Sequence, residues 1–553
     1  MINKFVNKRS WDCNKTVNWI VVLNEFHFIK ITFKDTYMKP VELLWIDDEI
    51  DFLKSHIIFL TDKGYEVDTS TNGNDALELI KKIQYDIILL DENMPGINGI
   101  QTLKLIKKIN QNLKVIMITK SEEENIMEEA IGKEISDYLI KPVNPNQILL
   151  SLKKNLKEKE LIKDNSVLEY QQEFRNLSLK MMDINNFEEW TDLYKEIVNW
   201  EIKLSDINDS TMIEILMTQK SEANSLFAKF ISNNYSRWIN SLDGPTLSHH
   251  LIKNHLIKEL DTESATMFIV IDNLRYDQWM VIEPLILDFY KKEKELSYYS
   301  ILPTTTQYAR NSLFSGLMPI DIKKDYPQYW KDDHENGGKN LFEYELLDNN
   351  LKKLSNYKIV HEYFKITNLK NGLKLAGNLK EKLKNNLTTI VYNFVDMLSH
   401  SKTEMEMIKE LASNDKAYRS LTKSWFENSP LYDIIKNAKD LGFKLVITTD
   451  HGTINVKNPA KIIGDKNTSQ NLRYKTGKSL TYNPKENISF KNPEEIHLPK
   501  TSINSSFVFS KEDYYLVYPN NYNHYSNYFK NTYQHGGVSM EEMIIPFVVL
   551  NPK

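Results

Sequence analysis

Short apolar runs alternate with longer amphipathic stretches in the first part of the chain, from Pro40 to about Lys157. The runs cover Val41–Ile46, Asp86–Leu90, Lys114–Ile118 and Tyr138–Ile140. Near-continuous apolar strands separated by helical stretches are typical of a parallel sheet that is covered by helices on both faces. The pattern therefore predicts a doubly wound α/β domain over residues 38–157.

A long helical segment is predicted next. Neither glycine nor proline occurs in the 98 residues from Asn146 to Asp243, and apolar residues there keep near-helical spacing. Asp, Asn, Ser and Thr cluster at 183–186 and 205–211, where they can cap new helices. We therefore expect a helical-bundle linker over residues 158–243.

Apolar strand patterns return in the last part of the chain. They cover Met267–Ile271, Thr389–Val395, Phe443–Thr449 and Met543–Leu550. Long polar segments separate these runs, which predicts a second and larger α/β domain over residues 244–553. The fold class expected for the whole chain is therefore α/β multidomain.

The first 37 residues differ in pattern from the rest of the chain. Their longest apolar run, Trp19–Leu23, is too short for a signal-peptide core or for a membrane span. A strand pattern starts directly after Met38. We expect residues 1–37 to be an extension outside the fold, either disordered or read from a wrongly assigned start codon, and we expect no membrane insertion.

Composition narrows the class of protein. A length of 553 residues corresponds to about three or four domains. The net charge of −5 provides no overall positive field, so a nucleic-acid partner would have to be bound locally. Cys13 is the only cysteine, which excludes an intramolecular disulfide and a zinc site built from cysteines. These features favour a cytoplasmic enzyme.

Acidic residues follow two of the N-terminal strands. Asp47 and Asp48 come after Val41–Ile46, and Asp91 comes after the next apolar run. Because parallel strands end at the same edge of a sheet, we expect the three carboxylates to meet there. Such oxygen ligands suit Mg²⁺, which would neutralise an incoming phosphoryl group while Asp91 attacks it.

Two further strand ends complete this site. Thr119 and Lys141 also follow apolar runs, and both side chains can hold a phosphoryl oxygen. Together with Asp91 in the run Asp91-Glu-Asn-Met94-Pro95-Gly96, and with Tyr138 before Lys141-Pro142, these residues resemble a response-regulator receiver domain. The resemblance implies a flavodoxin-like fold, phosphorylation of Asp91 by a sensor histidine kinase, and a conformational switch at Thr119, Tyr138 and Lys141. Receivers carry a small residue after the switch threonine, whereas this chain has Lys120.

A second set of polar residues lies in the C-terminal domain. Its members are Asp272, Thr306, Asp396, His400, Asp450, His451 and His535, each at or near a predicted strand end or a turn. They divide into two shells, Asp272 with Thr306, Asp450 and His451, and Asp396 with His400 and His535. Mixed histidine and carboxylate shells suit two Zn²⁺ ions, although the same donors also suit Mn²⁺. Two metals close together would activate a threonine for in-line attack on phosphorus.

This set resembles the alkaline-phosphatase superfamily and, within it, the PglZ domain. The motifs are Ile271-Asp272-Asn273, Pro303-Thr-Thr-Thr306, Asp396-Met-Leu-Ser-His400, Thr449-Asp450-His451-Gly452 and His535-Gly536-Gly537. The resemblance implies that Thr306 is the nucleophile and that the ordered ligands hold zinc. Thr305, directly before Thr306, stays open as an alternative nucleophile.

A basic stretch between the Asp450-His451 pair and His535 bears on the substrate. Arg473, Lys475 and Lys478 could clamp phosphates, and Tyr474 could stack on a base. With Asn273, these three residues form the expected substrate-binding set. The alternative is an ordinary solvated loop, because lysine is abundant throughout the chain.

The domain order resembles that of the PorX-like response regulators. The resemblance implies a homodimer on phosphorylation, a zinc-dependent phosphodiesterase acting on linear or cyclic oligonucleotides, and contact with a sigma factor or with type IX secretion components. A second interpretation stays open, in which the PglZ domain is a non-catalytic docking platform. The complete ligand set beside a nucleophile favours the enzyme, because a scaffold gains nothing from it.

Overall fold

The computed structural model describes most of the chain. The described residues are 19–21, 29–31, 41–119, 135–207, 210–241, 243–261, 264–404, 410–412, 414–465, 468–500 and 502–553. The chain divides into two compact units, Met1–Asp164 and Asn165–Lys553. Of the N-terminal extension, the structure describes only β1 (Trp19–Val21) and β2 (Ile29–Ile31), which pair antiparallel. The remainder of the extension, on which the expectation of disorder depends, lies outside the described residues.

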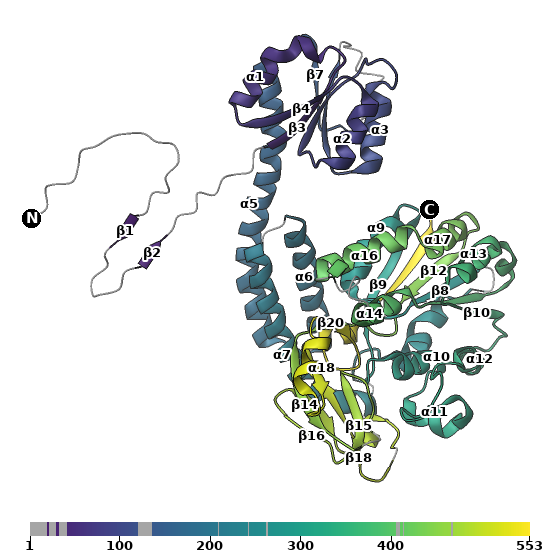
Figure 1. Ribbon diagram of the computed structural model, residues 1–553. Helices are drawn as coiled ribbons and strands as arrows, with labels where there is room; N and C mark the ends of the chain where they lie inside the picture. Colours follow the sequence, from purple (N-terminus) through teal and green to yellow (C-terminus); the bar gives the residue numbers. More distant parts are fainter. Residues whose placement is uncertain are drawn as a thin grey trace, which may run out of the picture. The chain divides into compact units, whose positions relative to one another are not determined.

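The first unit contains a five-stranded parallel sheet in the order β4-β3-β5-β6-β7. Figure 1 labels β3, β4 and β7 of this sheet with helices α1, α2 and α3 around them. The strands are β3 (Val41–Ile46), β4 (Tyr65–Ser70), β5 (Ile87–Asp91), β6 (Lys114–Thr119) and β7 (Asp137–Ile140). This is the order of a flavodoxin-like doubly wound fold, and it confirms the prediction.

Helices cover both faces of this sheet because alternate residues of its strands point to opposite faces. Leu44 and Ile46 share a core with helices α2 (Gly73–Lys82) and α3 (Gly99–Ile109). Trp45, which points the other way, packs with α1 (Lys54–Asp62), which follows a 3₁₀ turn at residues 50–53, and with the start of α5. Two buried faces explain why these strands are apolar at nearly every position.

Three long helices follow the receiver-like sheet. Helix α5 (Pro145–Asp183) begins in the first unit, and α6 (Phe187–Asp206) and α7 (Ser210–Asn240) belong to the second. The breaks between them fall where the polar clusters predicted them, and the Asn186 side chain accepts a hydrogen bond at the start of α6. No helix in the described part of the chain is long and apolar enough to cross a membrane.

A six-stranded sheet forms the centre of the second unit, in the order β10-β11-β8-β12-β21-β9. The strands are β8 (Thr266–Ile271), β9 (Tyr290–Tyr299), β10 (His361–Ile366), β11 (Leu387–Tyr392), β12 (Lys444–Thr448) and β21 (Ile544–Pro552). Strands β10, β11, β8 and β12 are parallel, whereas β21 runs antiparallel to its neighbours β12 and β9.

The predicted strand Thr389–Val395 was wrong at its C-terminal end. Strand β11 ends at Tyr392, and Phe394 starts helix α14 (Phe394–Glu404). The apolar pair Phe394 and Val395 extends the run in the sequence, although both residues are already helical. Asp396 therefore lies in the first turn of a helix instead of directly at a strand end.

Shorter elements surround the central sheet. The helices are α8 (Ile257–Glu259), α9 (Tyr276–Leu287), α10 (Asn311–Ser315), α11 (Pro319–Asp325), α12 (Glu343–Leu354), α13 (Leu369–Gly377), α16 (Asp415–Glu427), α17 (Pro430–Asp440), α18 (Tyr522–Phe529) and α19 (Met540–Met543). Three small sheets accompany these helices. The first pairs β13 (Ile454–Val456) with β20 (Thr532–Gln534). The second contains β14 (Asn458–Ile463) between β16 (Thr481–Tyr482) and β19 (Tyr514–Val517), and the third contains β18 (Ser505–Ser510) between β15 (Tyr474–Lys478) and β17 (Asn487–Phe490).

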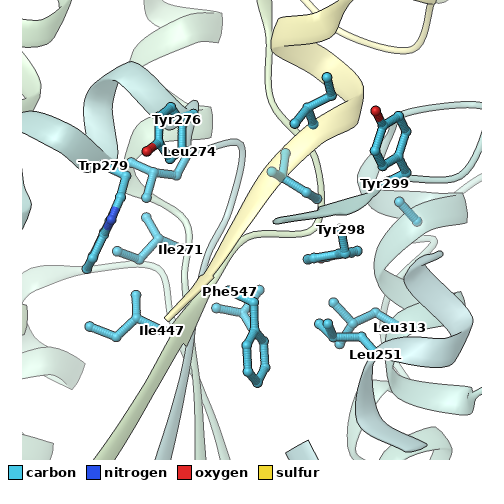
Figure 2. Packing of buried hydrophobic residues seen from close by; sticks show 14 of the residues in the cluster. Leu251, Ile271, Leu274, Tyr276, Trp279, Tyr298, Tyr299, Leu313, Ile447 and Phe547 are labelled. Atoms are coloured by element: carbon cyan, nitrogen blue, oxygen red, sulfur yellow. The ribbon is translucent and has the colours of Figure 1, made fainter. Parts of the chain in front are cut away.

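One hydrophobic core joins the linker helices to the central sheet. The ring of Tyr299 on β9 contacts the rings of Phe187 on α6 and Trp238 near the end of α7, with centroids 6.4 Å and 5.8 Å apart. Figure 2 shows buried side chains on both sides of the strand that carries Phe547. Because helices α6 and α7 bury their apolar faces in this core, they form one packed body with the sheet.

Candidate functional site

The first cluster lies at the carboxyl edge of the N-terminal sheet. Asp47 directly follows β3, and Asp91 is the last residue of β5; both are buried, whereas Asp48 is exposed. One carboxylate oxygen from each of the three lies within 4.8 Å of the others. The structure thus brings together the three predicted magnesium ligands.

Lys141 crosses to this cluster from the loop after β7. Its Nζ lies 2.9 Å from Asp47 Oδ2 and 2.8 Å from Asp91 Oδ1. Burial raises the pKa of Asp91, and the Lys141 ammonium opposes that shift. Burial also works to lower the pKa of Lys141, but the two ion pairs outweigh it and the pKa is raised. The ammonium therefore stays charged beside the predicted phosphorylation site.

Thr119 and Tyr138, the other two of the three predicted switch residues, are placed differently. Thr119 is buried at the end of β6, and its hydroxyl donates a hydrogen bond to the carboxylate of Glu92, the residue after Asp91. Tyr138 lies on β7 with 46% of its side chain exposed. Lys120, which departs from the receiver pattern, lies outside the described residues.

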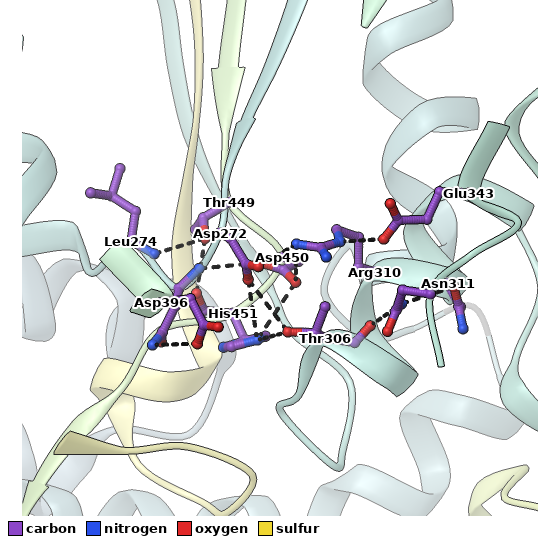
Figure 3. Close-up of polar contacts among 12 residues, drawn as sticks. Asp272, Leu274, Thr306, Arg310, Asn311, Glu343, Asp396, Thr449, Asp450 and His451 are labelled. Carbon is purple, nitrogen blue, oxygen red and sulfur yellow. Dashed lines mark hydrogen bonds and ion pairs between the residues drawn. The ribbon is translucent and has the colours of Figure 1, made fainter. Parts of the chain in front are cut away.

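The second cluster lies where two strands of the larger sheet end. Asp272 follows β8, and Asp450 and His451 follow β12, the strand next to it. One ligand atom from each lies within 4.8 Å of the others, and all three residues are fully buried. Thr306, the first residue of a π-helical turn at 306–310, faces them (Figure 3). Parallel strands from distant parts of the chain thus assemble the predicted first shell.

The two candidate threonine nucleophiles have different surroundings. Thr306 Oγ1 lies 3.4 Å from Asp272 Oδ1 and 3.2 Å from His451 Nε2. Thr305 Oγ1 is buried without a hydrogen-bond partner among the described residues. The geometry therefore favours Thr306 over Thr305.

The rings of His451 and His535 are both oriented by a backbone carbonyl group. His451 Nδ1 lies 3.1 Å from the Gly452 carbonyl oxygen, and His535 Nδ1 lies 3.3 Å from that of Thr304. A carbonyl only accepts, so each Nδ1 carries a hydrogen, and in the neutral ring of His451 the Nε2 atom keeps its lone pair. Burial lowers the pKa of His451 to about 4, which keeps its imidazole neutral, as a ligand must be.

The neighbouring residues only partly neutralise the negative charges of the two buried carboxylates in this cluster. Burial raises the pKa of Asp272 well above its ordinary value, with Arg310 opposing that shift and Asp450 adding to it. No described residue donates a hydrogen bond to Asp450 Oδ2, which is buried. Two buried carboxylates and a neutral imidazole with a free lone pair fit a bound divalent cation, because a cation would satisfy all three.

The second predicted shell lies beside the first. His535 Nε2 is 3.6 Å from Asp396 Oδ1, and the rings of His535 and His451 stack with centroids 4.4 Å apart. Burial works to lower the pKa of His535, but the Asp396 carboxylate outweighs it and the pKa is raised. His400 lies on α14, one helical turn after Asp396, and its side chain lies outside the described residues.

Sequence reasoning missed a buried arginine in this site. Arg310 Nη1 lies 2.6 Å from Asp272 Oδ2 and 3.7 Å from Asp450 Oδ2, while its Nε lies 2.6 Å from Glu343 Oε1 (Figure 3). The signal was its position four residues after Thr306, which places both side chains near one face of a helical turn.

Asn273 contacts protein groups within the site. Its backbone is left-handed, with φ of 64°, and its Nδ2 lies 3.4 Å from Asp396 Oδ1 and 3.1 Å from Ser399 Oγ. The amide thereby joins the loop after β8 to helix α14. Its Oδ1 is buried and has no hydrogen-bond partner among the described residues.

The predicted phosphate clamp was wrong for two of its three basic residues. Arg473 is fully buried and pairs with Glu542 at 2.6 Å. Lys475 is also buried, and its Nζ donates a hydrogen bond to the Ser469 carbonyl oxygen. Tyr474 packs against aromatic rings instead of facing solvent. Only Lys478, at the end of β15, is exposed.

Three family models match successive parts of the chain. A response regulator receiver domain matches residues 43–153, a PorX response regulator linker domain matches 160–239, and a BREX system PglZ alkaline phosphatase-like domain matches 250–550.

Curated relatives match the N-terminal part. Chemotaxis protein CheY of Thermotoga maritima is 36% identical over 96 residues, which are 17% of this chain and 80% of that protein. Transcriptional regulatory protein ZraR of Klebsiella oxytoca is 33% identical over 118 residues, which are 21% of this chain and 27% of that protein. The CpxR homolog of Haemophilus influenzae is 35% identical over 114 residues, which are 20% of this chain and 48% of that protein. The chain thus spans less than half the length of these two transcriptional regulators.

Among solved structures, chemotaxis protein CheY4 of Vibrio cholerae is 28% identical, with a TM-score of 0.20. The match covers 21% of this chain and 98% of that one. The receiver domain of the Francisella response regulator 1452 is 27% identical, with a TM-score of 0.21, and the match covers 22% of this chain and 98% of that one.

Proposed function

The chain belongs to the PorX-like response regulators, in which a receiver, a linker and a PglZ alkaline phosphatase-like domain follow one another, and on this basis we propose that it is a phosphorylation-controlled, zinc-dependent phosphodiesterase. The substrates proposed are linear or cyclic oligonucleotides. The protein would act in the cytoplasm.

One observation carries the catalytic proposal. The half-buried Thr306 hydroxyl oxygen lies 3.4 Å from Asp272 and 3.2 Å from His451, beside a buried group of potential metal-ligand atoms. A hydroxyl nucleophile at that place supports covalent catalysis, because the groups that activate it are already in reach.

The reaction proposed is an in-line displacement at phosphorus. The Thr306 oxygen forms a bond to phosphorus while the bond to the leaving alcohol breaks, so that the threonine proton passes to solvent and the leaving oxygen takes one up. Water then attacks the phosphorus of the threonine phosphodiester, the threonine oxygen leaves and regains a proton, and a phosphomonoester is released. Zinc held by Asp272, Thr306, Asp450 and His451, and by Asp396, His400 and His535, would supply positive charge to the phosphoryl oxygens and to both the attacking and the leaving oxygen.

We propose that phosphorylation of the receiver domain controls this activity. Asp91 would accept a phosphoryl group from a sensor histidine kinase with Mg²⁺ held by Asp47, Asp48 and Asp91, and Thr119, Tyr138 and Lys141 would respond to it. Homodimerisation would follow phosphorylation. A sigma factor and type IX secretion components are the proposed partners. Asn273 and Lys478 stay as proposed substrate contacts, Asn273 through its buried Oδ1 and Lys478 through its exposed ammonium.

Hydrolysis of bis-p-nitrophenyl phosphate and of a short RNA tests the catalytic proposal. Wild type, Thr306→Ala, Thr305→Ala and EDTA-treated protein are compared, with bound metal measured on each sample. We expect turnover in wild type and in Thr305→Ala, none after EDTA, and at least a thousandfold loss in Thr306→Ala with metal retained. Full metal occupancy in wild type without turnover would contradict the proposal and favour the docking platform.

A further inference from the structure

A buried lysine on linker helix α7 joins the linker to the PglZ domain. Lys220 Nζ lies 2.9 Å from Glu201 Oε2 on helix α6 and 3.0 Å from Glu541 Oε1 on α19. All three side chains are buried. Asn224, one turn after Lys220, donates a hydrogen bond from Nδ2 to Glu541 Oε2 at 2.9 Å and accepts one from the Met540 backbone N–H at 2.8 Å. Two adjacent turns of α7 thus bind both carboxylate oxygens of Glu541 and the backbone N–H of Met540.

Helix α19 in turn contacts the backbone beside His451 and His535. The Gly452 N–H, next to His451, donates to the Glu542 carbonyl oxygen at 3.1 Å. A Cβ added at Gly452 would lie 2.0 Å from the Glu541 carbonyl oxygen, so the two backbones are in close contact. The Gly537 N–H, two residues after His535, donates to Glu542 Oε1 at 2.9 Å.

A second branch runs from helix α6 to the loop that carries Asp272. Arg419 on α16 pairs with Glu201 and, at 3.1 Å, with Asp277. Arg275, three residues after Asp272, pairs with Asp277 at 2.5 Å and with Asp415 at 2.7 Å. The guanidinium of Arg275 lies over the rings of Tyr418 and Tyr533, at 5.6 Å and 5.3 Å from their centroids.

This branch ends at the remaining ligand segments. Tyr533 precedes His535 by two residues, and its hydroxyl donates to Asp415 Oδ1 at 2.8 Å. Tyr418 lies beneath helix α14, where its hydroxyl is 3.4 Å from the carbonyl oxygen of Val395, the residue before Asp396. The network therefore touches the chain next to Asp272, Asp396, His451 and His535.

We propose that Lys220, Asn224 and Glu541 are positioning residues for the metal site, so that the linker helices form part of its supporting shell. The inference deepens the proposed function, because it concerns the same metal ligands. Ion pairs buried this deeply repay their desolvation only with good geometry. Loss of a group that hydrogen-bonds directly to a metal ligand typically weakens metal binding about 10- to 100-fold, and these residues act one step further out, through the backbone beside the ligands, so a loss near the lower end of that range is expected.

A matched control is available in the same interface. Lys195 on α6 pairs with Glu295 on strand β9 at 3.2 Å, and it likewise joins the linker to the sheet. Glu295 lies on the outermost strand and forms hydrogen bonds with Tyr276 and Lys292. Loss of this pair removes a linker contact that reaches the Asp272 segment only through Tyr276 and makes no contact with Glu541, Gly452 or the His535 segment among the described residues.

The experiment measures Zn²⁺ affinity of the full-length protein by competition with a chromophoric chelator, together with thermal unfolding of the metal-free protein. The variants are Lys220→Met, Lys220→Arg, Asn224→Ala and Lys195→Met. We expect Lys220→Met to weaken Zn²⁺ binding by about tenfold and Asn224→Ala by about fivefold. Lys220→Arg should recover most of the affinity, and Lys195→Met should stay within about twofold of wild type.

The outcomes separate this proposal from the proposed function. Unchanged Zn²⁺ affinity in Asn224→Ala and Lys220→Met, or an equal loss in Lys195→Met, would overturn the positioning role while leaving the hydrolase proposal intact. If Lys220→Met does not fold, Asn224→Ala decides, because it changes no charge. Wild type that binds zinc without hydrolysing esters would contradict the hydrolase proposal alone, and wild type that binds neither Zn²⁺ nor Mn²⁺ would overturn both.

Discussion

Arg310 places its guanidinium 2.6 Å from the Asp272 carboxylate, whose other oxygen lies 3.4 Å from the Thr306 hydroxyl. The arginine also pairs with Glu343, whose other oxygen contacts Lys365 at 3.0 Å. A fixed cation behind a metal-ligand carboxylate reduces the repulsion between Asp272 and Asp450. The arginine and a bound metal would therefore share the neutralisation of these two carboxylates.

Arg310→Met should destabilise the metal-free protein and make it more responsive to zinc. Removing one partner of a buried ion pair costs about 3–5 kcal/mol, because the remaining charges are uncompensated. Zinc would replace part of the missing charge, so we expect added Zn²⁺ to raise the melting temperature more in the variant than in wild type. Thermal unfolding with EDTA and with Zn²⁺ measures this. The double variant Arg310→Met/Glu343→Gln should recover part of the loss, and an equal zinc response in variant and wild type would contradict the argument.

Lys141→Met should change two affinities of the receiver in opposite directions. The ammonium lies within 2.9 Å of both Asp47 and Asp91, so it repels a cation bound there and attracts a phosphoryl group. We expect Mg²⁺ to bind several-fold more tightly to the variant and beryllofluoride, a phosphoryl mimic, to bind more weakly. Titration calorimetry measures both. Lys141→Arg keeps the charge and is the control; tighter binding of both ligands to Lys141→Met would count against this role.

Lys475 predicts a pH dependence of stability. Burial lowers its pKa to about 7. Below pH 7 the amine is protonated in the folded and the unfolded protein, so the cost of burying the charge is fully present. Between pH 7 and about 10 only the unfolded chain holds the proton, so this group makes stability rise with pH, by at most about 1.4 kcal/mol per unit.

The variant Lys475→Met removes this titration. The free energy of unfolding of wild type minus that of Lys475→Met should therefore increase from about pH 7 to about pH 9, as measured by urea denaturation. Lys478→Met, at an exposed position of the same strand, is the control and should show no such trend. A difference that is flat over this range would show that Lys475 keeps an ordinary pKa.

Gly452→Ala should destabilise the second unit. Its Cβ would lie 2.0 Å from a backbone oxygen that cannot move independently, and overpacking of this kind costs about 1–3 kcal/mol. Gly377→Ala, at the end of α13, is the matched control, because no atom lies within 4 Å of its added Cβ. We expect the control to be neutral or stabilising by up to about 1 kcal/mol. Differential scanning calorimetry compares the two, and a normal melting temperature for Gly452→Ala would refute the close contact.

Interior strands were easier to predict from the sequence than edge strands. Strands β3, β5, β8 and β12 lie inside their sheets and are buried on both faces, which produces the apolar runs that reveal them. Strands β4, β9 and β10 were missed, and each lies at the edge of a sheet. These three strands are partly exposed and carry polar residues, so no apolar run marks them, whereas the edge strand β7 was predicted because Tyr138–Ile140 forms a short run.

Some residues of the candidate site could likewise be predicted from the sequence and others could not. Asp272, Asp450 and His451 could be predicted because each follows an interior strand, and such ends meet at one edge. The burial of Arg473 could not be predicted, because it depends on Glu542, which lies 69 residues away in the chain. The burial of Glu343 could not be predicted either, because it depends on an ion pair with Arg310, which lies on another helical segment. Charge alone does not reveal whether a side chain faces solvent or a buried counter-ion.

The place of β21 in the central sheet also has a consequence for synthesis. This strand, Ile544–Pro552, lies between β12 and β9, so β9 cannot join the sheet until β21 is present. While the ribosome is still adding these residues, one side of β12 remains an unpaired apolar edge, a surface open to chaperones and to self-association. The side of β12 that precedes the candidate ligands Asp450 and His451 is therefore covered only once β21 has been synthesised and has paired with it.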